Sequence, residues 1–371
     1  MRILIAPDKF KGTLTGPEAA AAMAEGALRV YPDAVVTALP IADGGEGTVE
    51  VAVAAGFSER LNAVVGPILK PVGAVWGFDE GSKVAVIETA QASGYLLSEP
   101  TVENALRAHS YGSGQLIAAA LDAGATEIII GLGGSAMTDA GTGALRALGL
   151  KLLDVHGNLV PLGGGSLIDV VAVDATGLDP RLAAVKVRMA VDVDNPLYGA
   201  DGAAYIFAPQ KGADTDAVEL LDAGLRNVAS VVREATGIDM DVPGSGAAGG
   251  FPSMFVAYAN ASVERGFDLV ASLINLDNAL AQTDLVITGE GSLDAQSLSG
   301  KGPLGVADAA HAKGIPVVVV AGRITVTPQE LAKHGVVAAV SATDVAGSPE
   351  AALADAARYT TRATSEALNG I

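Results

Sequence analysis

The chain has 371 residues, which is enough for roughly two domains of about 150 residues each. Its 42 acidic residues outnumber the 23 lysines and arginines and give a formal net charge of −19, so nucleic acids and anionic membranes are disfavoured as partners because they are negative themselves. No cysteine is present, which excludes disulfides, zinc bound by thiolates and a cysteine nucleophile.

The N-terminal residues 2–6 predict a short buried strand. This apolar run is too short for the hydrophobic region of a signal peptide, and no run of about 18 apolar residues follows, so we expect a cytoplasmic protein. A helix is expected from Thr15 onward, because Thr15 and Glu18 have the spacing of a capping box. The polar loop between strand and helix carries Asp8, Lys9 and Lys11.

A second strand is expected over residues 33–41, followed by a loop in which Asp43 and Glu46 lie among glycines. Acids at this position have two interpretations. They can cap the helix that follows, which is common at helix N-termini, or they can bind a ligand, as polar loops after strands often do.

The middle of the chain changes pattern twice. Residues 61–65, 72–78 and 83–89 predict strands separated by Gly and Pro turns without helices, which is typical of an antiparallel meander. Alternation of helix and strand returns between residues 104 and 150. Residues 150–207 then favour strands and turns, including a strand at 203–207. Later segments predict helices at 215–236 and 349–368 and strands at 285–287, 316–321 and 336–340.

The simplest architecture for this order is an α/β fold of two domains. A domain with a parallel, Rossmann-like sheet would comprise residues 1–64, 98–150 and 282–371. A mixed-sheet α/β domain, residues 65–97 and 151–281, would be inserted into it. Ligand sites favour domain interfaces, so we expect the site in the cleft between the two.

The polar loop after the strand at 285–287 has the densest set of reactive groups. Ligands of open α/β sheets bind at the carboxyl ends of strands. Glycine amides and a lysine suit phosphate, and carboxylates suit Mg²⁺. The loop therefore predicts a metal–phosphate site, with a plain surface connection as the alternative. Its candidate residues are Gly289, Glu290, Ser292, Asp294 and Lys301.

Residues 131–136 follow a predicted strand and satisfy the dinucleotide-binding pattern G-x-G-x-x-G/A. Asp154 lies near the place of a ribose-binding acid, about twenty residues beyond the motif. These features make an NAD-dependent dehydrogenase an alternative interpretation. Against it, Ser135, Thr138 and Asp139 make the expected helix start polar, and a helix N-terminus binds other phosphates equally well.

Residues 192–199 end a predicted strand with Asp192 and Asp194, which would point to the same side if the strand continued. They could bind a cation or position a hydroxyl, or simply form a turn. The four histidines lie outside the glycine loops, and no G-x-S-x-G motif occurs. The remaining reactive groups are Asp, Glu, Lys, Ser and Thr in glycine loops, which suits phosphoryl transfer.

Seven blocks of the sequence, in order, are residues 6–14, 42–48, 131–141, 192–197, 209–212, 246–250 and 288–296. Together they resemble the bacterial glycerate kinases of the first type, and the resemblance spans essentially the whole chain. It implies ATP- and Mg²⁺-dependent phosphorylation of D-glycerate to 2- or 3-phosphoglycerate, and a flavodoxin-like domain with an inserted mixed domain. Lys9, Met137, Ala140 and Ala190 depart from the family pattern without removing a charged site residue.

The resemblance also implies roles for the candidate residues. Glu290 and Asp294 are expected to hold Mg²⁺. The catalytic group would be Asp192, Asp43 and Lys11, with Asp192 favoured as the base. The expected glycerate-binding residues are Asp8, Lys9, Lys11, Asp43 and Asp194. The expected ATP- and phosphate-binding residues are Gly133, Gly134, Ser135, Thr138, Gly289, Glu290, Ser292 and Lys301.

The expected partners are therefore small molecules, glycerate and a nucleotide, with no nucleic acid and no membrane. A third interpretation, besides the kinase and the dehydrogenase, is a non-catalytic binder of small organic anions. The oligomeric state does not follow from the sequence.

Overall fold

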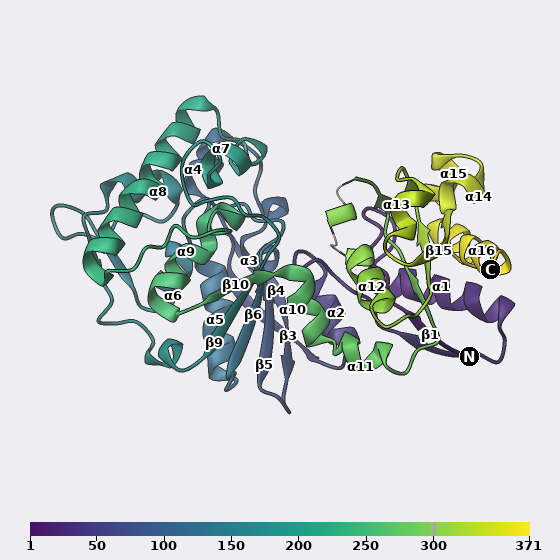
Figure 1. Ribbon diagram of the computed structural model, residues 1–371. Coiled ribbons are helices and arrows are strands. Elements are labelled where there is room, and N and C mark those ends of the chain that lie inside the picture. The colour runs from purple at the N-terminus through teal and green to yellow at the C-terminus, as the bar shows by residue number, and fades with distance from the viewer. Residues whose placement is uncertain (296, 300–301) are drawn as a thin grey trace. The chain divides into compact units, whose positions relative to one another are not determined.

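The structure is a computed structural model that describes residues 1–295, 297–299 and 302–371. The chain divides into two compact units (Figure 1). Unit 1 comprises Met1–Asp43, Glu50–Gly56 and Phe267–Ile371, and unit 2 comprises Gly44–Val49 and Phe57–Gly266. Within the described ranges, no helix combines the length and the apolar character that a membrane crossing requires.

Unit 1 contains a five-stranded sheet in which every neighbouring pair runs parallel. The order is β15-β13-β11-β1-β2, which in chain order is the flavodoxin arrangement 2-1-3-4-5. The strand order reverses between β1 and β11, and sheets of this kind bind ligands at that point. The strands are β1 (Arg2–Ile5), β2 (Val35–Ala38), β11 (Leu285–Thr288), β13 (Val317–Ala321) and β15 (Val336–Ser341), with a small parallel pair β12 (Ser292–Leu293) and β14 (Arg323–Ile324).

The central strands of unit 1 are buried on both faces, which explains their uninterrupted apolar sequences. Side chains alternate between two hydrophobic cores, as the two-residue period of a strand requires. Leu4 and Val319 pack into one core, whereas Ile5 and Val318 pack into the other. The helices are α1 (Gly16–Val30), α2 (Thr48–Ala54), α10 (Gly266–Leu273), α11 (Leu276–Leu280), α12 (Gly302–His311), α13 (Pro328–Ala332), α14 (Ala342–Ala346), α15 (Pro349–Ala354) and α16 (Ala356–Asn369), with a 3-10 turn at Ser297–Ser299. The first residues of α2 and α10 fall within the bounds of unit 2.

Two local features fix helix α1. The predicted capping box is present: the Thr15 hydroxyl accepts a hydrogen bond from the Glu18 N–H, and the Glu18 carboxylate accepts one from the Thr15 N–H. Helices α1 and α16 lie side by side (Figure 1). Their close approach requires Gly26, because a Cβ there would lie 2.4 Å from the carbonyl oxygen of Thr361.

Unit 2 contains a mixed six-stranded sheet in the order β10-β9-β6-β5-β4-β3. The pairs from β10 to β5 are parallel, and β5, β4 and β3 form the predicted antiparallel meander. The strands are β3 (Ser58–Val65), β4 (Pro71–Asp79), β5 (Val84–Glu88), β6 (Glu127–Gly131), β9 (Lys186–Val191) and β10 (Ser262–Arg265), with an antiparallel pair β7 (Lys151–Leu153) and β8 (Ala172–Asp174). The helices are α3 (Thr89–Ser93), α4 (Val102–Arg107), α5 (Tyr111–Asp122), α6 (Thr142–Ala147), α7 (Ala203–Phe207), α8 (Thr215–Thr236) and α9 (Ala247–Ala259), with 3-10 turns at Tyr95–Leu97, Gly164–Asp169, Pro180–Ala183 and Pro209–Lys211.

The α/β class with a parallel and a mixed sheet agrees with the sequence prediction, but the division of the chain differs from it. Residues 98–150 were expected beside β1, whereas β6 pairs with β5 and β9 in unit 2. The reason is that strand–helix alternation predicts a parallel strand without indicating which sheet receives it. Residues 203–207, expected as a strand, form helix α7, because a run this short does not distinguish the two by its periodicity.

Candidate functional site

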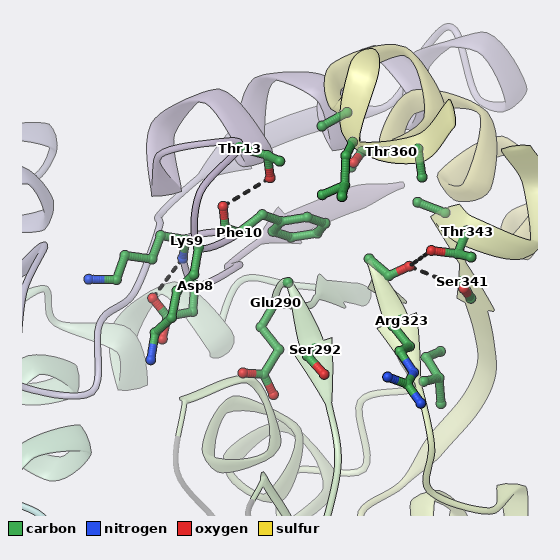
Figure 2. Close-up of a pocket in the computed structure, with 18 of the residues that line it drawn as sticks. Asp8, Lys9, Phe10, Thr13, Glu290, Ser292, Arg323, Ser341, Thr343 and Thr360 are labelled. Carbon is green, nitrogen blue, oxygen red and sulfur yellow. Dashed lines mark hydrogen bonds between the residues drawn. The ribbon is translucent and has the colours of Figure 1, made fainter. Parts of the chain in front are cut away.

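The carboxyl ends of four parallel strands in unit 1 border one cavity of about 830 Å³ (Figure 2). Asp8 follows β1, Glu290 follows β11, Arg323 follows β13 and Ser341 ends β15. Parallel strands bring their carboxyl ends to the same edge of a sheet, so four distant segments of sequence meet here. Other lining residues that matter below are Lys9, Phe10, Lys11, Asp43, Ser292, Asp294, Ser297, Thr343, Pro349, Ala352, Leu353, Ala356 and Thr360.

Carboxylates are concentrated at the β1–β11 side of this cavity. Burial and the negative charge of Asp43 raise the pKa of Asp8 to about 7, with a smaller contribution from Glu290. The N–H of Lys9 donates to Asp8 Oδ1 at 2.6 Å and opposes this rise. The cluster therefore favours either a proton or a bound cation.

Glu290 and Asp294 are linked through one hydroxyl. Ser297 Oγ donates to Glu290 Oε1 at 2.7 Å and accepts from the Asp294 N–H at 3.2 Å. Burial raises the pKa of Glu290, the Ser297 hydrogen bond lowers it, and the charge of Asp294 raises it again. The two predicted metal ligands thus lie near each other in the folded chain.

A divalent cation fits this acidic group only with help from a ligand. Across the described residues, no group of three or more His, Asp or Glu side chains is placed to hold a metal ion alone. Mg²⁺ in phosphate-binding enzymes commonly uses one or two carboxylates and completes its shell with phosphate oxygens and water. Lys9, Lys11 and Arg323 also line the cavity and would attract such phosphates.

Gly289 allows β11 and β13 to pack closely beside the cavity. A Cβ on Gly289 would lie 1.6 Å from the carbonyl oxygen of Val320, so no other residue fits between β11 and β13. Its own carbonyl accepts the N–H of Asp8 at 2.8 Å. Gly289 therefore sets the places of Asp8 and Glu290, and Ser292 beyond it is exposed at the cavity.

In unit 2 the glycine loop after β6 lies against residues 44–48. The Leu132 N–H donates to Gly44 O at 3.3 Å, and a Cβ at Gly134 would lie 2.2 Å from Glu46 Oε1. Gly134 also has φ +69°, which favours glycine. Two of the predicted glycine loops are thus brought together within this unit, and Gly133, Gly134 and Ser135 remain partly exposed.

The helix expected to open at this glycine motif does not do so. Helix α6 begins only at Thr142, and the buried carboxylate of Asp139 already accepts the N–H groups of Gly141 and Gly143. Asp139 therefore already satisfies N–H groups at the N-terminus of α6, and these groups are not available to bind an anion. Thr138 is buried and its Oγ1 has no hydrogen-bond partner among the described residues, so its phosphate contact stays a prediction. Asp154 caps its own turn by accepting the N–H groups of His156 and Asn158.

Lys211 is held against the glycine loop by hydrogen bonds. Its buried ammonium donates to the Met137 carbonyl at 2.6 Å and to Ser135 Oγ at 3.4 Å. Burial lowers the pKa of Lys211 to about 7, and the charge of Asp139 opposes that change. Lys211 thus holds the segment that carries Ser135.

Asp192 lies just beyond β9, partly buried, with Oδ1 accepting the N–H of Gly266 at 3.1 Å. Because β9 ends at Val191, strand geometry does not align Asp192 with Asp194, and Asp194 is exposed. Asp43 lines the unit 1 cavity. Lys301 lies outside the described residues.

A profile for the "Glycerate kinase family" matches residues 3–371. The chain belongs to the glycerate kinase family. The glycerate 2-kinase of Escherichia coli (strain K12) is 44% identical over 343 residues, which cover 92% of this chain and 90% of that protein. The glycerate kinase of Bacillus subtilis (strain 168) is 43% identical over 364 residues, covering 98% and 95%. A crystal structure of a Salmonella typhimurium LT2 protein assigned as glycerate kinase 2 superposes with a TM-score of 0.89 at 38% identity, covering 100% of this chain and 98% of that one.

Membership of the glycerate kinase family confirms the resemblance and the fold class predicted from the sequence. It leaves the dehydrogenase alternative without support. Four residues that line the unit 1 cavity were not predicted from the sequence: Arg323, Ser341, Thr343 and Thr360. The first three follow or end predicted strands and could have been found by that signal, whereas Thr360 lies within a helix and has no local marker.

Proposed function

We propose that this enzyme transfers the γ-phosphoryl group of ATP, as its Mg²⁺ complex, to the 2-hydroxyl of D-glycerate. The observation that carries the proposal is the unit 1 cavity, where carboxylates and lysines gather at the strand-order reversal of a parallel sheet. The choice of product, 2-phosphoglycerate, is supported by the name of the Escherichia coli relative, glycerate 2-kinase.

Glu290 and Asp294 would hold the metal in this scheme. Mg²⁺ would neutralise the charge of the phosphates during transfer. The raised pKa of Asp8 supports a cation here, because a nearby positive charge would allow the buried carboxylates to ionise together. Ser292, Lys9 and Lys11 would bind phosphate oxygens or the glycerate carboxylate from the same cavity, beside Asp43.

In unit 2, Asp192 is the proposed general base for the attacking hydroxyl. Its hydrogen bond from the Gly266 N–H orients one carboxylate oxygen, which is the kind of fixation that a base requires. The exposed parts of Gly133, Gly134 and Ser135 would bind substrate oxygens, with Lys211 holding Ser135 in position.

The decisive experiment supplies the purified protein with D-glycerate, ATP and Mg²⁺ and follows ADP release with a coupled assay. Added enolase distinguishes the products, since it converts 2-phosphoglycerate to phosphoenolpyruvate and leaves 3-phosphoglycerate unchanged. ADP release without an enolase product would refute the 2-hydroxyl assignment. Binding of D-glycerate without turnover, or reduction of NAD⁺, would refute the kinase.

Replacing Asp192 by Asn should lower kcat by roughly 10²–10⁴-fold if Asp192 is the base. Asp201→Asn, an exposed acid of the same unit, is the matched control and should leave kcat unchanged. A folded Asp192→Asn protein with normal turnover would eliminate this assignment.

A further inference from the structure

The unit 1 cavity has two chemically different ends. The end near β1 and β11 is lined by carboxylates and lysines. The other end is lined from α15 and α16 by uncharged residues, namely Pro349, Ala352, Leu353, Ala356 and Thr360. Asp344, on the neighbouring helix α14, is a charged residue that also lines the cavity. In Figure 2, Thr360 lies across the cavity from Glu290, with the ring of Phe10 between them in the view.

Thr360 is the unusual residue at the uncharged end. It is fully buried, and its Oγ1 has no hydrogen-bond partner among the described residues. A helical threonine commonly satisfies its hydroxyl by donating to a carbonyl one turn earlier. Thr364 does this, with Oγ1 donating to Thr360 O at 2.8 Å. Thr360 leaves a buried hydroxyl unsatisfied, which native structures seldom tolerate without a reason.

Several hydroxyl groups nearby do have partners. In the cavity wall, Thr13 Oγ1 donates to Phe10 O at 3.0 Å and Thr343 Oγ1 to Gly322 O at 2.8 Å. On the next position of α16, Thr361 Oγ1 donates to Ala22 O at 3.0 Å. Among the described residues, the buried side-chain atoms His109 Nε2 and Thr138 Oγ1 also lack a partner, but both belong to unit 2. Thr360 is therefore the one such residue described in the wall of the unit 1 cavity, where a ligand can reach it.

A nucleotide has the two chemistries that this cavity offers. Its phosphates require the cationic and metal-binding end, and its base requires apolar walls with a few placed polar groups. A cavity of about 830 Å³ lies within the range that encloses ligands of this size. Ala352, Leu353 and Ala356 provide an apolar wall, and the Thr360 hydroxyl provides a polar group at its edge.

We propose that the α15–α16 end of the cavity is the nucleobase subsite. The flat face of the base packs against Ala352, Leu353 and Ala356, and Thr360 Oγ1 forms a hydrogen bond with the polar edge of the base. This assignment rests on the proposed function, because phosphates held at the charged end determine which part of the nucleotide reaches α15 and α16.

Thr360→Val tests the hydrogen bond without changing the size of the side chain. No hydrogen bond of the free protein is lost, so its thermal unfolding temperature should stay the same or rise. The Kd for ADP, measured by calorimetry, should rise about 5- to 30-fold, the effect of losing one hydrogen bond to a ligand. The Kd for inorganic tripolyphosphate should not change, since that ligand lacks the base.

Thr364→Val is the matched control on the same helix. It removes the hydrogen bond from Thr364 Oγ1 to Thr360 O, so it should lower the unfolding temperature and leave the Kd for ADP unchanged. Ala356→Phe fills the subsite and should raise the Kd for ADP at least 10-fold while tripolyphosphate still binds. An unchanged Kd for ADP in both Thr360→Val and Ala356→Phe would overturn the subsite.

The outcomes separate this inference from the proposed function. If the wild-type enzyme phosphorylates glycerate but neither variant weakens ADP binding, the function stands and the subsite is wrong. If glycerate is not phosphorylated but both variants weaken ADP binding selectively, the subsite stands and the function is wrong. If Thr360→Val weakens tripolyphosphate as strongly as ADP, the hydroxyl contacts phosphate and the nucleobase assignment is overturned.

Discussion

Asp8→Asn should stabilise unit 1 at neutral pH while it impairs the proposed activity. The pKa of Asp8 is raised from 3.8 to about 7, mainly by burial and by Asp43. At about 1.36 kcal/mol per pKa unit, a rise of about three units corresponds to a penalty near 4 kcal/mol for the ionised side chain. Asp8 is partly exposed, and solvent screens part of this electrostatic penalty. We therefore expect Asp8→Asn to raise the unfolding free energy of unit 1 by about 1–3 kcal/mol at pH 8. Asparagine keeps an oxygen that can accept the Lys9 N–H.

The pH dependence has a definite sign. Between pH 3.8 and about 7, the folded chain binds a proton at Asp8 that the unfolded chain has released. The stability due to this proton is present below the unfolded pKa and is lost as the pH rises through the folded pKa. The advantage of Asp8→Asn over the wild type should therefore grow from about pH 4 to about pH 7 and stay constant above that.

The assay must report on unit 1. The single tryptophan, Trp76, lies in unit 2, so its fluorescence does not serve here. Amide hydrogen exchange of peptides from β1 and β11, corrected for intrinsic rates, reports the opening free energy around Asp8 at pH 6 and pH 8. Asp33→Asn removes an exposed acid of the same unit and should have no such effect. Exchange in Asp8→Asn that is no slower than in the wild type at pH 8 would refute the reasoning.

Further predictions concern the glycine loop and the metal. Between about pH 7 and pH 10.5, Lys211 has lost its proton in the folded wild type but keeps it in the unfolded chain. The unfolding free energy of the wild type should therefore contain a contribution from Lys211 that increases with pH over this range. Lys211→Met should remove this component in urea unfolding followed by Trp76 fluorescence, and exposed Lys70→Met should keep it. Gly134→Ala should lower kcat/KM roughly 10-fold or more and destabilise by about 1–3 kcal/mol, because alanine disfavours φ +69° and its Cβ would collide with Glu46; unchanged kinetics would show that the loop tolerates a side chain. Chelation of Mg²⁺ with EDTA should abolish ADP release and added Mg²⁺ should restore it; full activity in EDTA would exclude the metal.

The sequence predicted best what depends on neighbouring residues. The buried strand before Glu290 and the capping box at Thr15 both follow from local patterns, and both are present. Pairing between distant strands was harder, since nothing in the sequence of β6 distinguishes a place beside β5 from a place beside β1.

The candidate site was predictable to the same extent. Asp8 and Glu290 follow strands directly, and the structure brings them to one cavity. Thr138 follows a glycine motif, but it is buried because Gly164 and Gly249 pack against it, and no local motif encodes those two contacts. Thr360 contributes to the cavity only because the sheet order places α16 beside residues that are hundreds of positions earlier.

The pairing of β1 with β11 has a consequence for synthesis on the ribosome. β1 comprises Arg2–Ile5, and its partner β11 begins at Leu285. β1 therefore cannot pair with β11 until most of the chain has been synthesised. Residues 57–266 are contiguous and can fold in the meantime, since domains generally fold as units during translation. A nascent chain that stops before Leu285 would leave β1 with only one of its two neighbouring strands, so the sheet of unit 1 is completed late in synthesis.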